Sequence, residues 1–371
     1  MTRRVALLSV ALFAAGCGRP SSTGQPGDRP DRPQAAHAAI TVAPNAVSCS
    51  TPAPRLLNSA LCLCEDLHLV GRGVLVTSSD PLDAPVGVNG VTHVVGQTHF
   101  VSGLVSWGGI SGTGDLTVGL DAVTPQSVSV VGTTRIGGDL VVGGDLDSVG
   151  TLEVDGLTRV SGHVSVVGSR SSLRAAGYQA PAAPPCGCDP SSFLDVAGLV
   201  AAARASNDNA RIGLEGVDHV GELTLTLDGG RFFLSGLRSV GRLALTVTKP
   251  SALYIDGDLE TVGDDRLSVE EGASLDLYVN GRLENVGRWT VSDSTKAGVV
   301  RLYIGGKDAM VQSVGQHDFV GAVYAPEAPV ELVGDTSFRG ALFAKSLSGV
   351  GELTVDYAAP AVPQAGTCPG P

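Results

Sequence analysis

The feature that most constrains this chain is a recurring Val-Gly pair, and twelve of its copies form a spaced series between residues 70 and 351. The glycines of the twelve pairs are Gly71, Gly96, Gly132, Gly150, Gly168, Gly221, Gly241, Gly263, Gly287, Gly315, Gly334 and Gly351. Where the series is dense, successive pairs are 17 to 28 residues apart. A fixed spacing of roughly 20–50 residues is typical of architectures that stack one short unit on the next.

The sharpest copies of the repeat are Leu253-Tyr-Ile-Asp-Gly-Asp-Leu-Glu-Thr-Val-Gly263 and Leu277-Tyr-Val-Asn-Gly-Arg-Leu-Glu-Asn-Val-Gly287. Apolar residues alternate along each copy, which places them on one face of a strand. Asp-Gly and Asn-Gly suit turns that need a positive φ, and the Val-Gly pair offers a second corner. Such a rung cannot bury its apolar face alone, so neighbouring rungs must stack to form the core.

The repeat therefore predicts an all-β fold, a right-handed parallel β-helix (β-solenoid) with one inserted helix. About 300 residues at roughly 24 per rung predict about a dozen rungs, and a spacing of about 4.8 Å predicts a rod roughly 60 Å long.

One stretch breaks the β pattern. Asp189-Pro190 predicts a helix N-cap followed by proline at the first helical position. Residues 193–206 have helical spacing and many alanines, which predicts one helix that ends near Asn207-Asp208-Asn209. We expect it to pack along the solenoid or to divide the β region. The expected organisation is an N-terminal solenoid half at 47–180, a Cys-Pro loop and helix at 181–210, C-terminal solenoid repeats at 211–358 and a tail at 359–371.

Composition and charge exclude several classes. The chain has 371 residues with 50 Gly but only 17% charged residues, and hydrophobic residues make up 43%. Disorder of the bulk is excluded because it needs high charge and low hydrophobicity. A collagen helix is excluded because no Gly-X-Y period is present. The net charge is −12 and no stretch forms a basic stripe. Nucleic acid is therefore not an expected partner.

The N-terminus carries a targeting segment. Arg3 and Arg4 precede the apolar residues 5–15, which are too few to span a bilayer. The following Ala14-Ala15-Gly16-Cys17 resembles the bacterial lipobox. The resemblance implies a lipoprotein signal peptide at 1–16, acylation (including palmitate) of Cys17 and a membrane partner bound through the N-terminal lipid. An ordinary signal peptide with a chance cysteine is the alternative. Gly18, where the resemblance would place Asp for inner-membrane retention, implies the outer membrane.

Residues 17–46 are rich in Pro, Ser and Ala, which predicts a lipidated N-terminus followed by a flexible tether. Loss of the signal peptide leaves an even number of cysteines, as expected for disulfides in an exported chain. The six are Cys49, Cys62, Cys64, Cys186, Cys188 and Cys368.

On a strand, Cys62 and Cys64 point to one face, so the Cys186 and Cys188 pair is the obvious partner, although the connectivity stays open. Four thiolates could also bind a metal, but the spacing is C-x-C and the compartment is oxidising. No metal and no cofactor is expected.

Aromatic residues recur at one outward position of successive copies. They are Phe233, Tyr254, Tyr278, Tyr303, Tyr324 and, less regularly, Phe343. Stacked rings at this position predict a ladder on the outer face of the rungs. The ladder is either structural and covered by the helix, or a candidate surface for envelope polysaccharide or another surface protein.

Motifs of catalysis are missing from the sequence. No G-x-S-x-G, P-loop or HExxH occurs. The nearest acidic cluster is Asp256, Asp258, Asp264 and Asp265, and turn formation accounts for it. Asp139 and Asp145 follow Gly-Gly pairs, where an Asx turn fits better than a calcium site. We expect no enzyme; the alternative is a carbohydrate-active β-helix enzyme, a polysaccharide lyase or glycoside hydrolase.

The last repeats carry a resemblance. Phe319-Val-Gly-Ala-Val-Tyr-Ala-Pro326, Phe338-Arg-Gly-Ala-Leu-Phe-Ala-Lys-Ser346 and Gly351-Glu-Leu-Thr-Val-Asp-Tyr357 are similar to an uncharacterised repeat domain of myxobacterial lipoproteins and PilX-type pilus-assembly proteins. Gly138-Asp-Leu140 and Gly144-Asp-Leu146 loosely resemble phrases of bactofilins, which are polymerising β-helical proteins. The resemblance implies a lipid-anchored envelope protein, periplasmic or surface-exposed, with a structural or adhesive role.

Overall fold

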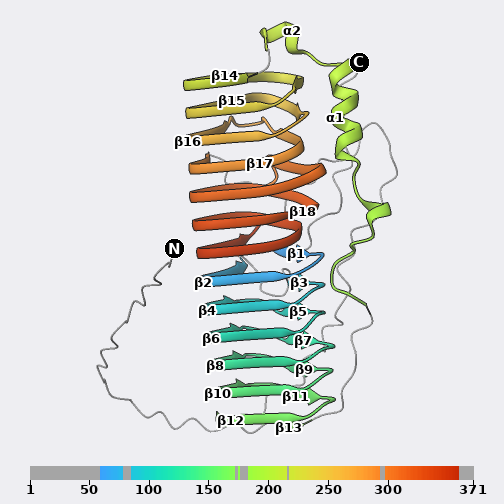
Figure 1. Ribbon diagram of the computed structural model, residues 1–371, viewed down its shortest axis with the longest axis vertical. Coiled ribbons are helices and arrows are strands. Elements are labelled where there is room, and N and C mark those ends of the chain that lie inside the picture. Colours follow the sequence, from blue (N-terminus) through green and yellow to red (C-terminus); the bar gives the residue numbers. More distant parts are fainter. Residues whose placement is uncertain are drawn as a thin grey trace, which may run out of the picture. The chain divides into compact units, whose positions relative to one another are not determined.

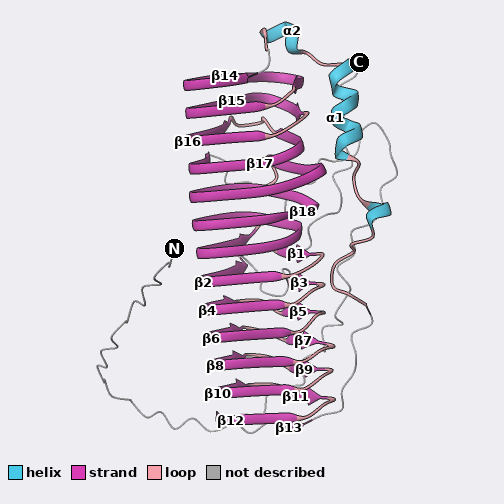
Figure 2. Cartoon of the chain, in the orientation of Figure 1, coloured by secondary structure: helices cyan, strands magenta, loops and turns pink. Residues whose placement is uncertain are grey.

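The computed structural model describes residues 59–77, 85–171, 174–175, 183–214, 217–292 and 297–358. All of them belong to the unit Ala38–Pro371. The expectations for the signal peptide, the tether, Cys17, Cys49, Cys368 and the C-terminal tail lie outside the described residues. The strands of this unit pair in parallel register and stack as rungs, which confirms the predicted all-β parallel β-helix (Figures 1 and 2).

The N-terminal half contains the first thirteen strands and has two strands in most rungs. Its shorter strands hold two to four residues and its longer strands seven to eleven. The strands are β1 (Leu61–Leu63), β2 (Leu67–Thr77), β3 (Val86–Val88), β4 (Thr92–Phe100), β5 (Leu104–Ser106), β6 (Ile110–Val118), β7 (Ala122–Thr124), β8 (Val128–Ile136), β9 (Leu140–Val142), β10 (Leu146–Val154), β11 (Leu157–Val160), β12 (Val164–Arg170) and β13 (Arg174–Ala175).

The C-terminal half has longer strands that bend through the corners of the rungs. They are β14 (Val217–Leu234), β15 (Leu237–Ile255), β16 (Leu259–Val269), β17 (Leu275–Ser292) and β18 (Val300–Tyr357). Leucine, valine and isoleucine side chains on the inner faces of both halves form one buried core cluster. The alternation that the sequence shows within each copy therefore becomes a continuous apolar interior.

The two halves join in an order that differs from the order of the chain. Residues 347–357 of β18 pair with β2, from Leu347 opposite Leu67 to Tyr357 opposite Thr77. Leu342 of the same strand lies opposite Leu61 of β1. The last rung of the chain thus stacks on the first, without a covalent connection between them. Along the axis the rungs run from β14 to β18 and continue from β1 to β13 (Figure 1). We call this contact the joint.

Residues 183–214 connect the two halves and contain the helices (Figure 2). Asp189 caps only a 3₁₀ turn, η1 (Pro190–Ser192), because Phe193 returns to an extended backbone. The α-helix α1 (Val196–Ala205) has its own cap, since the Asp195 side chain accepts a hydrogen bond from the Gly198 N–H. The predicted single helix is therefore shorter, and a second one, α2 (Asn209–Ile212), follows it. None of the helices among the described residues has the length and apolar character to cross a membrane.

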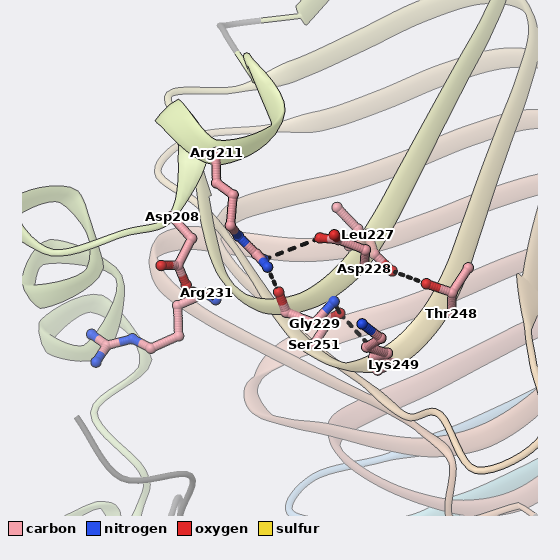
Figure 3. Close-up of polar contacts among 9 residues, drawn as sticks. All are labelled: Asp208, Arg211, Leu227, Asp228, Gly229, Arg231, Thr248, Lys249 and Ser251. Atoms are coloured by element: carbon pink, nitrogen blue, oxygen red, sulfur yellow. Dashed lines mark hydrogen bonds and ion pairs between the residues drawn. The ribbon is translucent and has the colours of Figure 1, made fainter.

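The segment before and within α2 caps the outer edge of β14, the first strand along the axis (Figure 3). The Asp208 carboxylate accepts a hydrogen bond from the Arg231 N–H at 2.7 Å, and the Asp208 N–H donates to the Arg231 carbonyl at 2.7 Å. Arg211 donates to the Gly229 carbonyl and pairs with Asp228 at 3.1 Å. These contacts satisfy backbone groups that would otherwise form an open sheet edge.

Candidate functional site

A column of thirteen glycines runs along the solenoid and fixes its backbone. It comprises the twelve glycines of the Val-Gly pairs and Gly114, and their φ angles lie between 108° and 136°. A Cβ on any of them except Gly221 would come within 1.8–2.3 Å of the carbonyl oxygen of the preceding glycine in the column. No side chain fits there, so the repeated glycine is a steric requirement of the stack.

The residue before each of these glycines points outward and forms what we call the valine ladder. In axial order it comprises Val220, Val240, Val262, Val286, Val314, Val333, Val350, Val70, Val95, Thr113, Val131, Val149 and Val167. The ladder crosses the joint unbroken, because Val350 lies opposite Val70.

The valine ladder exposes an unusual amount of apolar surface. Ten of its valines are 37–80% exposed. Together they present on the order of 800 Å², above the roughly 300–600 Å² of the largest apolar patch on a typical monomer. The Val-Gly pairs predict a corner of the rung, but they do not predict that the valine side chain points outward into water.

Polar side chains flank the ladder on both sides, two residues before and two residues after each valine. In the C-terminal half these columns carry ion pairs between rungs, such as Arg242 with Glu222 at 3.8 Å and Arg238 with Glu260 at 3.6 Å. In the rungs of β8, β10 and β12, which are farthest from the joint in the N-terminal half, the columns consist mainly of hydroxyl residues, from Ser129 and Thr133 to Ser165 and Ser169. The two halves thus present the same valines between different flanks.

The aromatic ladder exists, but it is not an exposed surface. The rings of Tyr254 and Tyr278 stack at 4.7 Å and those of Tyr278 and Tyr303 at 4.6 Å. Tyr324 and Phe343 continue the column with tilted rings. All five are at most 9% exposed. They pack with α1 through Val196, Val200 and Ala203, and Phe233 is partly buried against the same cluster. The expectation of a surface for a glycan or protein partner is wrong for these rings, because α1 covers them.

Polar contacts fix the covering segment on the ladder. The Tyr324 hydroxyl accepts a hydrogen bond from the Leu194 N–H at 2.9 Å, and burial raises the pKa of Tyr324 to about 12. Beside Tyr303, Arg301 forms a two-point ion pair with Asp276 at 2.5 and 2.8 Å. Burial, together with the Asp276 carboxylate, also raises the pKa of Tyr303. These hydroxyls stay protonated at neutral pH and serve packing.

Two disulfides attach the same segment to the joint. Cys62 is bonded to Cys186 and Cys64 to Cys188, each across 124 residues. This is the partnership that strand geometry favours, and it excludes the thiolate metal site for these four residues. Asn89 holds Cys186 by donating to its carbonyl and accepting from its N–H, both at 2.9 Å. Because β1 pairs with both β18 and β3, the bonds lie where the two halves meet.

The acidic residues of 256–265 do not converge on one groove. Asp256 pairs with Arg204 at 2.5 Å, and Asp258 accepts a hydrogen bond from the Arg282 N–H at 2.8 Å. Asp264 is exposed, whereas Asp265 is 5% exposed and faces the interior.

Asp139 and Asp145 act in turns, since their carboxylates accept the N–H groups of Leu157 and His163 in the next rung at 2.8 and 2.7 Å. Within the described residues, no group of three His, Cys, Asp or Glu side chains could hold a metal.

A buried polar network in the C-terminal half was not foreseen. Asn285 donates to Asp265 at 2.6 Å and to Thr261 at 2.7 Å, and its carbonyl lies 3.0 Å from His317 Nε2. Burial raises the pKa of Asp265 and lowers the pKa of His317. The network borders a cavity of about 40 Å³ lined mainly by leucines and by Trp289. The signal in the sequence is Asp265 at an inward position that Leu243 occupies one rung earlier.

A comparison with models of protein families gives a match for the C-terminal half. Residues 186–360 match the model of a family described as a domain of unknown function, DUF7305. The matched region begins at Cys186 and spans α1, α2 and the strands β14 to β18. Neither a curated protein nor a solved structure matches the chain.

Proposed function

We propose that this chain is a lipid-anchored protein of the bacterial cell envelope whose solenoid has a structural or adhesive role. The observation that carries the proposal is the valine ladder, which presents an exposed valine on ten of its thirteen rungs. A surface of this kind suits contact along a length rather than the enclosure of a small substrate. The glycine column and the shared core hold the ladder in a fixed register.

Two further observations support the envelope location. Disulfides are typical of proteins in oxidising compartments outside the cytosol, and this chain has two of them at its joint. The N-terminal Ala14-Ala15-Gly16-Cys17 resembles a lipobox, and Cys17 is the proposed acylation site. Two or three acyl chains would anchor the protein stably. The resemblance of the last repeats to a domain of myxobacterial lipoproteins and PilX-type pilus-assembly proteins is a further reason for proposing an envelope location.

A carbohydrate-active enzyme is the competing proposal. Burial raises the pKa of Asp265, but the side chain faces the solenoid interior and accepts a hydrogen bond from Asn285. A glycosidase pair needs two carboxyl groups about 5–10 Å apart across a bound sugar. Asp256 and Asp258 are engaged by arginine partners instead. The described acids therefore favour the structural role.

The test of the proposal uses the full chain expressed in a diderm bacterium. We expect incorporation of labelled palmitate, accumulation of the unprocessed form with globomycin, and sedimentation with outer membranes. Cys17→Ser should abolish the labelling, the effect of globomycin on processing and the sedimentation with outer membranes, whereas the matched variant Cys49→Ser should retain all three. Equal labelling and processing of the parent and Cys17→Ser would refute the anchor. Release of sugars from envelope polysaccharide by the purified chain would refute the structural role.

A further inference from the structure

We propose that two copies of this chain associate side by side and antiparallel, valine ladder against valine ladder, with the two-fold axis at Val350 beside the joint. This inference deepens the proposed function by naming the occupant of the ladder, a second copy of the same chain. Val350 belongs to the seventh of the thirteen rungs, so a two-fold axis there overlaps the two ladders along their whole length.

The area of the ladder fits such a contact. Its ten most exposed valines present on the order of 800 Å², which is about the area that one partner contributes to a stable interface of standard size. The second copy contributes an equal area with the same rung spacing. Identical apolar side chains at about 4.8 Å intervals can interdigitate between two packed sheets, as in a steric zipper.

The flanking charges favour the antiparallel direction. When the ladders overlap fully, each rung faces the rung at the same distance from the other end. Three pairs of opposite charge then meet, and they are Arg238 with Asp147, Arg288 with Asp115, and Asp335 with Arg72. The remaining acids of the C-terminal half mostly face the hydroxyl residues of the N-terminal half. Among the charged flanking residues, only Glu352 faces the same residue of the second copy, and Arg72 of its own chain lies 3.7 Å from it to offset the repulsion.

The other arrangements fit less well. A two-fold axis parallel to the rod would bring the two polar columns of the same rung together. Arg238 would then face Arg242, and Glu260 would face Asp264, and like charges at a contact oppose association. A membrane surface fits poorly as well, because the net charge of −12 and the acidic flanks would be repelled by anionic lipid.

The first experiment measures the oligomeric state of the full chain carrying Cys17→Ser, by sedimentation across the micromolar range. We expect a concentration-dependent dimer. Val149→Asp places two carboxylates in the contact and should raise the dimer dissociation constant about 100-fold. The matched control Thr224→Asp adds the same charge at an exposed position outside the ladder and should leave dimerisation unchanged. Because Val149 is 50% exposed, its variant should keep the melting temperature of the control.

The second experiment tests the direction by a charge swap. Arg288→Asp and Asp115→Arg should each weaken the dimer, because each places like charges opposite one another. The double variant exchanges the charges and should restore dissociation to near the parent value. In a parallel dimer Arg288 would face Glu284 and Asp115 would face Ser111, so the double variant would not recover.

A monomer at every concentration, a dimer that Val149→Asp leaves intact, or a double variant no better than the single ones would overturn the inference. A monomeric chain that is still acylated and sediments with outer membranes would leave the proposed function standing. If the Cys17→Ser chain dimerises but the parent chain takes up no palmitate in the bacterium, the proposed anchor is refuted and this inference stands.

Discussion

At the scale of single residues, the contact between successive glycine backbones leaves no room for a side chain in the column. Each glycine takes a φ that L side chains rarely adopt, and its hydrogens face the carbonyl of the neighbouring rung. Twelve of these positions can be found from the Val-Gly pairs. Gly114 was missed because Thr113 precedes it. The outward exposure of the valines could not be found in this way, because a dipeptide does not reveal the side of a corner.

Substitution in the column should therefore cost more than backbone strain alone. Gly132→Ala would place its Cβ 2.1 Å from the Gly114 carbonyl oxygen, and the two rungs would have to separate. We expect a loss of about 3 kcal/mol or more in the free energy of unfolding. Gly272 also has a positive φ, of 82°, but has open space around it, so Gly272→Ala should cost roughly 1 kcal/mol. Equal losses in urea unfolding of the two variants would show that the carbonyl contact does not matter.

The buried His317 should make stability depend on pH. Its pKa is lowered by burial, although Asp318 acts in the opposite direction, so the unfolded chain takes up a proton before the folded chain does. Stability should fall as the pH drops below about 6.5, by up to about 1.4 kcal/mol per pH unit. The pKa of Asp265 is raised, so the folded chain takes up this proton before the unfolded chain does. Protonation of Asp265 therefore increases stability as the pH falls. His317→Leu should remove the first slope in urea titrations, and an unchanged slope would assign it to other groups.

At the scale of elements, alternation within each copy predicts which side chains share a face, but it does not predict what covers that face. The tyrosines do point out of the solenoid core, and α1 then buries them in a second apolar cluster. The helix was predicted from Ala content and spacing, whereas its early boundary depends on Asp195 capping it in place of Asp189. Which face a helix covers depends on contacts between residues far apart in the chain, such as Leu194 with Tyr324.

The two disulfides should act as one constraint. Each bond spans 124 residues and the two loops are offset by only two residues, so the second bond adds little once the first has formed. Replacing Cys64 and Cys188 with alanine should cost under about 1 kcal/mol, whereas replacing all four cysteines should cost about 2–5 kcal/mol. Replacing only Cys62 and Cys186 adds the loss of buried side chains. Urea unfolding of the three variants measures the costs, and additive costs would contradict a shared loop.

At the scale of the whole described unit, the order of the rungs could not be predicted. Every rung offers similar apolar edges, so nothing local in the sequence specifies that β18 stacks on β2. The joint has the same parallel register as rungs that follow one another in the chain, with valine opposite valine and glycine opposite glycine. It also buries Leu61, Leu67 and Leu347 almost completely. The joint therefore resembles an ordinary rung contact, which links the halves into one core.

A rearranged chain tests this view of the joint. In the N-terminal half, three residues connect Phe100 to Leu104. Val355 lies in the same column as Phe100. Leu61 lies in the same column as Leu104. A permuted chain would start at residue 183, run to Ala358, continue at Ser59 through a short linker and end at residue 175. We expect it to form both disulfides and to melt in one transition, within a few degrees of the 59–358 chain. Two separate transitions would show that the halves fold independently, because a joint equivalent to a rung contact must transmit cooperativity.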